Sequence, residues 1–207
     1  MFALYSSINN RYTKSKKHLS KKTRKNRKTK GGNVVKPNNA IIFDCSYKKI
    51  THLDLSNCPD LELLKCNNNF LQTLDLSNCP KLTLLHCNDN QITELDLSNC
   101  PKLTKIHCNN NQITELYLSN CLELEKIKCN NNHLQALDLS HCIKLKKLNC
   151  NNNLLEELDI SQNDKLNLWS SNNPFRHQFD YNIDHDIERY RKWCKQNYNY
   201  HNETILK

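Results

Sequence analysis

Glycine is almost absent from this sequence. Only two of the 207 residues are glycine, and they lie side by side at Gly31 and Gly32. The chain therefore has no Gly-rich phosphate-binding loop and no nucleophile elbow, and it also lacks the HExxH motif of zinc hydrolases. We expect a protein that is not an enzyme and that needs no cofactor.

Long apolar runs are missing as well. No stretch approaches the ~20 consecutive apolar residues that a membrane span requires. The first residues, Met1 to Ile8, have no basic flank and only a broken apolar stretch, which is unlike a secretion signal. We therefore expect no membrane contact and an intracellular protein, cytoplasmic or nuclear, that is not secreted.

Acidic residues are absent from residues 1–42, which contain twelve Lys and Arg. Residues 43–173 contain twelve basic and sixteen acidic residues, so the formal charge of +9 arises from the N-terminal segment. Blocks of like charge repel one another and usually stay disordered. Residues 1–33 are thus predicted to form a disordered basic arm.

The arm carries a dense basic run without aromatic residues. Its members are Lys16, Lys17, Lys21, Lys22, Arg24, Lys25, Arg27 and Lys28. Such a run suits non-specific contacts with nucleic-acid phosphates, a nuclear address or a solubilising tail. Because no aromatic side chain is available to stack on bases, any nucleic-acid binding should be independent of sequence.

The sequence is rich in internal repetition. Six near-identical units of 21 residues run from about Ala40 to Lys165, and the clearest unit is KLTLLHCNDNQITELDLSNCP at Lys81 to Pro101. A strict period of this length is typical of a solenoid, in which each unit buries its apolar side only against its neighbours. A solenoid of this kind is expected to be a monomer.

Each unit contains two places where apolar and polar residues alternate. One runs from Leu85 to Cys87 and the other from Leu95 to Leu97. Period-two alternation predicts two short strands per coil, which would stack into parallel sheets with about 4.8 Å between coils. A further column, Asn69, Asn90, Asn111, Asn132 and Asn153, is expected to satisfy backbone groups of its own coil and of the next one.

The cysteines follow the same period. Eleven of the twelve fall into two columns spaced by 21 residues, and Cys194 stands apart. Neighbours in a column would have Cβ vectors that run parallel, which disfavours disulfides, and no CxxC pair offers a zinc site. A ladder of reduced, buried thiols is the preferred interpretation, with disulfides and metal binding as alternatives.

The residues Leu82, Leu85, Cys87, Asn90 and Ile92 match the pattern LxxLxLxxNxL, with Cys at the third Leu. The chain resembles leucine-rich repeat proteins, and in particular the 21-residue cysteine-containing repeats of internalin J-like proteins. The resemblance implies a right-handed, mainly parallel β solenoid with a concave sheet through His86. It also implies binding of other proteins rather than catalysis.

Three regions follow from these patterns. The arm covers residues 1–33, the solenoid residues 34–173 and a helical C-terminal cap residues 174–207. In the cap, apolar residues recur at helical spacing from about Asp184 to Gln196, which favours a helix covering the last coil. Continuing the period of 21 places Ser171 where the other coils have Cys.

The concave face is predicted to present a polar, locally basic strip. Its expected members are Lys65, His86, His107, Lys128, Lys105, Lys126, Lys147, Asn88, Asn109 and Asn130, with Leu63 and Leu84 on the same face. A competing interpretation is that like-charge columns, including the Asp column through Asp96, only reflect copying of one unit. The two histidines are expected to be solvated rather than to bind a metal.

Two functional hypotheses result. The first is a non-enzymatic module that binds an unknown protein on its concave face. The second is a nucleic-acid-associated protein that binds polyanions through the arm. Cys194 has basic neighbours that could activate its thiol, but its place on the apolar side of the helix favours a packed core residue.

Overall fold

The computed structural model describes residues 34–35, 40–175 and 187–198. The chain divides into two units, Met1–Gly32 and Asn33–Lys207, and every described residue belongs to the second. The basic run of the arm therefore lies outside the described residues.

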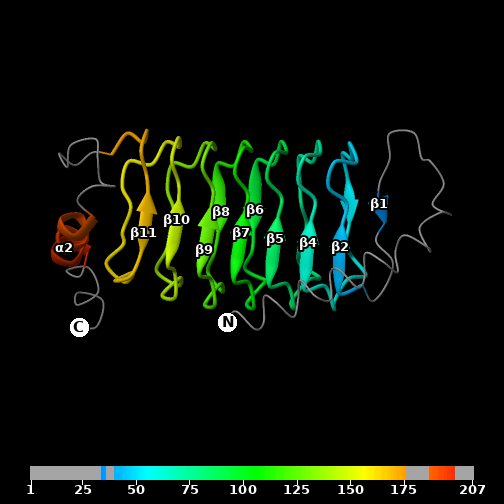
Figure 1. Ribbon diagram of the computed structural model, residues 1–207, viewed down its shortest axis with the longest axis horizontal. Helices are drawn as coiled ribbons and strands as arrows, with labels where there is room; N and C mark the ends of the chain where they lie inside the picture. The colour runs from blue at the N-terminus through cyan, green and yellow to red at the C-terminus, as the bar shows by residue number, and fades with distance from the viewer. Residues whose placement is uncertain (1–33, 36–39, 176–186, 199–207) are drawn as a thin grey trace, which may run out of the picture. The chain divides into compact units, whose positions relative to one another are not determined.

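The second unit is built around one parallel sheet of seven strands, which we call the main sheet (Figure 1). In spatial order its strands are β2 (Ile42–Asp44), β4 (Leu63–Lys65), β5 (Leu84–His86), β7 (Lys105–His107), β9 (Lys126–Lys128), β10 (Lys147–Asn149) and β11 (Asn167–Trp169). Each coil contributes one strand, and from β2 to β10 each residue pairs with the residue 21 positions later. The predicted parallel solenoid is confirmed.

The interior is filled by the repeated apolar columns. In the central unit Leu82, Leu85, Cys87, Ile92 and Leu95 are all completely buried, and the other coils repeat this pattern. Since a side chain in one column packs against the same position in the coils before and after it, the core is continuous along the solenoid.

The second predicted strand forms in only some of the coils. β6 (Glu94–Asp96) pairs with β8 (Glu115–Tyr117), and β3 (Leu53–Asp54) pairs with β1 (Val34–Val35). The equivalent residues 74–76, 137–139 and 158–160 keep the alternation of buried and exposed side chains but are not in strands. Alternation fixes which side chains enter the core, and that requirement is met without a hydrogen-bonded ladder between coils.

The buried asparagine column ties neighbouring coils together. Asn111 Nδ2 donates to the carbonyls of Cys87 (3.1 Å) and Cys108 (3.0 Å), and its Oδ1 accepts from the Ile92 N–H (3.0 Å). The amide thus bonds to backbone groups of its own coil and of the preceding coil, not of the next coil as expected from the sequence. A polar side chain is stable inside the fold because its donors and its acceptor are all used.

The last coil is one residue shorter than the others. Asn149 pairs with Trp169, a separation of 20 residues, and Cys150 N–H donates to the Trp169 carbonyl (2.8 Å). Ser170, which is buried, therefore takes the place of the cysteine, and the expectation for Ser171 was wrong. The residue is lost between Leu166 and Leu168, where the sequence LNL replaces the LxxL or LxxI of the other units.

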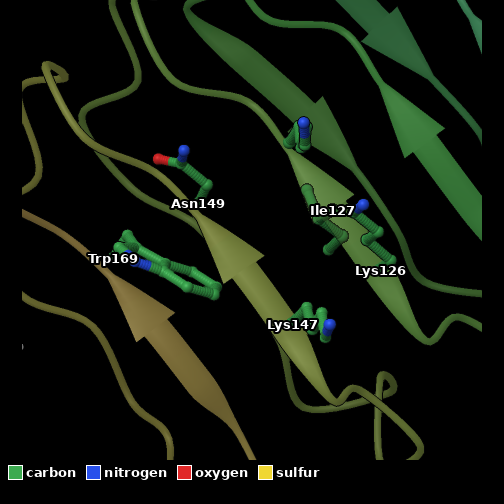
Figure 2. A pocket seen from close by; sticks show the side chains of 6 residues that line it. Lys126, Ile127, Lys147, Asn149 and Trp169 are labelled. Carbon is green, nitrogen blue, oxygen red and sulfur yellow. The ribbon is translucent and has the colours of Figure 1, made fainter.

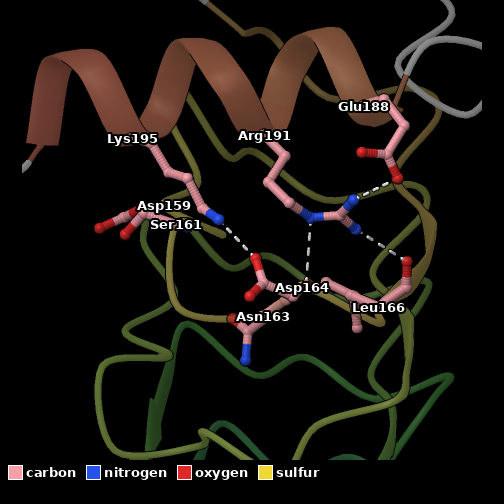
Figure 3. A network of polar contacts seen from close by, with 8 residues as sticks. All are labelled: Asp159, Ser161, Asn163, Asp164, Leu166, Glu188, Arg191 and Lys195. Atoms are coloured by element: carbon pink, nitrogen blue, oxygen red, sulfur yellow. Dashed lines mark hydrogen bonds and ion pairs between the residues drawn. The ribbon is translucent and has the colours of Figure 1, made fainter.

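Helix α2 (Ile187–Tyr198) packs on the last coil through its buried side chains (Figure 3). Arg191 is almost fully buried, and it donates from Nε to the Asn163 carbonyl (3.2 Å) and from a terminal nitrogen to the Leu166 carbonyl (3.4 Å). Tyr190 donates to the Leu158 carbonyl (2.5 Å). These contacts satisfy carbonyl groups of the last coil.

All twelve cysteines are buried and none is in a disulfide. In the first column the thiol of one coil donates to a carbonyl of the next coil, as Cys108 does to Lys128 (3.5 Å). Cys194 donates in the same way to the Leu158 carbonyl (3.6 Å) and is completely buried, which is the packed position that the sequence predicted. In the described part of the chain no helix is long and apolar enough to cross a membrane.

Candidate functional site

The predicted binding strip lies on the outward side of the main sheet, which we call the sheet face. Two columns run across it, because residues 1 and 3 of each strand point to the side opposite the core. The first column is Ile42, Leu63, Leu84, Lys105, Lys126, Lys147 and Asn167, and the second is Asp44, Lys65, His86, His107, Lys128, Asn149 and Trp169. Every predicted lysine and histidine of the strip lies in one of them.

The first part of the face is apolar. Ile42, Leu63 and Leu84 neighbour one another across β2, β4 and β5, and their exposed fractions are 7%, 2% and 4%. They lie outside the main core cluster. Leu63 and Leu84 thus lie on the predicted face but are buried, and the basic strip of the first column begins at Lys105.

The middle of the face holds the two histidines. The rings of His86 and His107 stack with their centroids 4.5 Å apart and their planes 7° from parallel. Burial, followed by the charge of Lys65, lowers the pKa of His86 to about 4. Burial, followed by His86 and the neighbouring lysines, lowers the pKa of His107 to about 3. The histidines are neutral and half-buried rather than solvated as expected.

The last part of the face is basic. Lys105, Lys126 and Lys147 follow one another in the first column, and Lys128 lies beside them in the second. Among the described residues Lys126, Lys128 and Lys147 form no ion pair. Burial lowers the pKa of Lys126, and the charges of Lys128, Lys147 and Lys105 lower it further. Lys126 is therefore repelled by the lysines around it.

A shallow pocket of about 270 Å³ opens among these lysines. Lys126, Lys128, Lys147 and Asn149 line it, and Trp169 from β11 closes one side (Figure 2). The Trp169 side chain is unusually open for so large an apolar group, with 43% of its surface exposed. The pocket thus combines positive charge with an aromatic wall, which suits an anionic group next to an apolar one.

Trp169 was not predicted as a site residue. Strict continuation of the 21-residue period pairs Ser170 with Asn149 and turns Trp169 toward the core. The shortened last coil shifts the register by one residue, and a one-residue shift moves a side chain to the opposite face of a strand. The sequence LNL at residues 166–168, one residue shorter than the LxxL or LxxI of the other units, was the signal that could have revealed it.

The predicted asparagines Asn88, Asn109 and Asn130 lie just past the strands and are half-buried. The residue after each of them has a positive φ of 56° to 57°, as at Asn110 and Asn131, which favours Asn over most other residues. Asn131 Nδ2 also donates to Asn110 Oδ1 (2.6 Å), and this ladder continues to Asn172. Backbone conformation and these bonds account for the asparagines of this column.

The aspartate column on the other side of each coil also has a structural role. Asp96 Oδ1 accepts a hydrogen bond from the Ser98 N–H (2.8 Å). The N–H of the residue two positions later also donates to the carboxylates of Asp54, Asp75, Asp138 and Asp159. This bond lowers the pKa of Asp75 and of Asp138. The column is explained by turn formation.

Burial makes the cysteine thiols poor nucleophiles and poor metal ligands. Burial raises the pKa of Cys108 and of Cys142 to about 12, and burial likewise raises the pKa of Cys194 to about 11. Within the described ranges no group of three or more His, Cys, Asp or Glu side chains is placed to hold a metal ion.

Comparisons with known proteins agree on the fold. Residues 80–121 match the family described as Leucine Rich repeats (2 copies). The functional domain of InlJ from Listeria monocytogenes, which includes a cysteine ladder, is 31% identical over 67% of this chain and 36% of its own, with a TM-score of 0.55. This chain therefore spans about a third of that domain.

Two further structures share the fold at lower identity. A leucine-rich repeat protein of Leptospira interrogans is 23% identical over 73% of this chain and 46% of its own, with a TM-score of 0.51. The leucine-rich repeat domain of APL1B is 22% identical over 64% and 48%, with a TM-score of 0.54. Among curated proteins there is no significant sequence match.

Proposed function

The chain is a leucine-rich repeat protein with units of about 21 residues, and on this premise we propose that it is a non-enzymatic module that binds a protein partner on the sheet face. Repeat solenoids commonly use their extended concave surface for binding. The sheet face corresponds to the face that the family resemblance predicts to be concave.

The basic part of the sheet face is the observation that carries this proposal. The asparagine and aspartate columns satisfy backbone groups or favour a required backbone conformation. Lys126, Lys128 and Lys147 neither satisfy backbone groups nor favour a required backbone conformation. Their mutual repulsion acts against folding. Copying of one unit does not account for them either, because the first column changes from Leu84 to Lys105 midway along the sheet. A partner with complementary charge gives these residues a role.

Site-specific photo-crosslinking tests the proposal. A photoreactive residue at His107 lies on the sheet face, and one at the exposed Thr114 lies elsewhere in the same coil. We expect a protein from the source cells to crosslink at His107 and not at Thr114. The same crosslink should disappear when Lys105, Lys126 and Lys147 are changed to Glu together. Equal crosslinking at both positions, or no effect of the triple change, would contradict binding on this face.

The second candidate is binding of polyanions through the arm. It is favoured by the twelve basic and no acidic residues among residues 1–42. Changing the eight basic residues from Lys16 to Lys28 to Gln should abolish binding to both RNA and DNA. Wild-type affinity should fall steeply with salt because it depends on release of counterions. A base-sequence preference, or retained affinity after the change, would argue against this role.

We also propose that the protein works inside the cell, in a reducing compartment. The buried thiols that form no disulfide support this location, since disulfides accumulate in oxidising compartments. Fractionation of cells that express the tagged full chain checks it, and recovery only from the exported fraction would count against it.

A further inference from the structure

We infer that the pocket between Lys126 and Trp169 binds an acidic segment of the partner, with carboxylates on the lysines and an apolar or aromatic side chain against the indole. This inference rests on the proposed function and names the chemistry of the partner at that site. It assigns Trp169 and the lysines 126, 128 and 147 as the residues that select the partner.

Charge complementarity is the first argument. The three lysines come from adjacent strands, so their positions are about 4.8 Å apart across the sheet and about 6.6 Å apart along β9. No residue of β7, β9, β10 or β11 is acidic. The nearest acid in sequence, Glu125, is nearly buried and pairs with Lys146 at 2.8 Å. The positive charge of the pocket is thus not neutralised by the described residues around it.

The aromatic wall is the second argument. The partly exposed Trp169 lies at the end of the basic strip, where Asn149 and then Lys128 precede it in the second column (Figure 2). Tryptophan is enriched among the residues that dominate binding energy in protein interfaces. A partner that covered only the lysines would leave the indole exposed, so the occupant should carry an apolar group beside its acids.

The size of the pocket favours peptide side chains over a small molecule. Its volume of about 270 Å³ lies below the range of roughly 300–1,000 Å³ that is usual for ligand pockets. A nucleic acid would also match the charge. However, single strands bind on successive aromatic platforms, and Trp169 is the one tryptophan, tyrosine or phenylalanine on the sheet face of the described strands.

Nuclear magnetic resonance titrations of the full chain with a short peptide test this inference. The probe is Glu-Glu-Phe-Glu-Glu, and Gln-Gln-Phe-Gln-Gln is its neutral counterpart. Binding of the first peptide should shift the amide resonances of β9, β10 and β11, whereas the second should leave them unchanged. Observing these resonances separates the pocket from any binding of the peptide by the arm.

Two triple variants provide the matched comparison. K126Q/K128Q/K147Q removes the pocket charges, and we expect it to weaken binding of the acidic peptide by about tenfold or more. K102Q/K144Q/K165Q removes the same number of exposed charges from a column away from the sheet face, and it should weaken binding by less than about twofold. Equal loss in both variants would overturn the inference, because binding would then depend on net charge alone.

A double-mutant cycle tests the role of the indole. W169A and replacement of the peptide Phe by Ala should each weaken binding, and the two losses should not add because they remove the same contact. Additive losses would show that Phe does not bind at Trp169. If an eight-residue oligothymidine shifts the same resonances at lower concentration than the peptide, the occupant is a nucleic acid and the inference is wrong.

The two proposals can fail separately. If the peptide does not bind but the His107 crosslink persists and is lost in the Lys-to-Glu triple variant, the sheet face binds a partner of other chemistry. If the peptide binds at the pocket but no protein crosslinks at His107, the pocket chemistry is right and the proposed function is wrong.

Discussion

The imidazole rings of His86 and His107 lie face to face, 4.5 Å apart, in the centre of the sheet face. Two charged imidazolium rings would repel at this distance, and lysines lie on both sides of the pair. The stack therefore depends on both rings being neutral. This requirement makes the histidines sensitive to pH.

The histidine pair should make the protein less stable in acid. The pKa values in the folded protein, about 4 for His86 and about 3 for His107, lie below the usual value near 6.5. Between about pH 6.5 and pH 3 the unfolded chain therefore binds more protons than the folded protein. The free energy of unfolding should be unaffected by this pair above pH 6.5 and should fall as the pH drops from 6.5 toward 3. Denaturant titrations across this range check it. The variant H86F/H107F, which keeps stacked rings, should lose less stability, and an equal loss would contradict this explanation.

Asn111 should contribute more to stability than its surface neighbour Gln112. N111A leaves the buried Ile92 N–H without its acceptor, at a cost of about 1–3 kcal/mol. The Cys87 and Cys108 carbonyls each lose one donor but keep the amide of Asn90 and of Asn132. We expect the free energy of unfolding to fall by about 1–3 kcal/mol. Q112A alters an exposed side chain and should change it by less than about 0.5 kcal/mol. Similar values for both variants would mean that the buried amide is not structural.

Tyr47 is a site where the first coil should be stabilised by substitution. Its φ is 59°, a conformation that costs a non-glycine residue about 1–2 kcal/mol, and its side chain is 73% exposed. The equivalent residue in the next coil is Asn68. Y47N should raise the free energy of unfolding by about 0.5–1 kcal/mol. The control F70N removes another exposed aromatic residue, and it should not stabilise the protein.

The thiols should be unreactive until the protein unfolds. Burial raises the pKa of Cys45, Cys100 and Cys108 to about 12, so few thiolates form near neutral pH. Iodoacetamide at pH 8 should label the native full chain slowly, and all twelve cysteines should react in denaturant without a reducing agent. Mass spectrometry counts the adducts. Fewer than twelve adducts on protein purified without air would reveal disulfides or other modifications.

Arg191 should secure the C-terminal cap. R191A removes the donors to the Asn163 and Leu166 carbonyls, and Glu188 loses its partner (Figure 3). Hydrogen exchange should increase in α2 and in the coil of β11 before it increases near β2, because each coil contacts only its neighbours. K192A alters an exposed side chain of the same helix and should leave exchange unchanged. Equal protection loss along all coils would contradict this local role.

The repeat period alone determined the parallel sheet, the buried leucine and cysteine columns and the side of each strand that faces outward. It could do so because a coil in a solenoid contacts only copies of itself, so one unit contains almost all the packing information. The same reasoning predicted the lysines of the sheet face correctly as neighbours. It did not predict that Leu63 and Leu84 would be buried, since burial at that face depends on more than the coil itself.

The tertiary structure decided two kinds of feature. One kind lies in the last coil, where the 21-residue period fails, and the other depends on contacts between side chains of neighbouring strands. The loss of one residue before Leu168 turns Trp169 outward beside the basic strip, and the strict period pointed it inward. The stacking of His86 on His107 and the lowered pKa of Lys126 depend on which side chains are adjacent across the sheet. Sequence order sets the contacts along one strand, but contacts between strands depend on register, and register is fixed only when the coils pack.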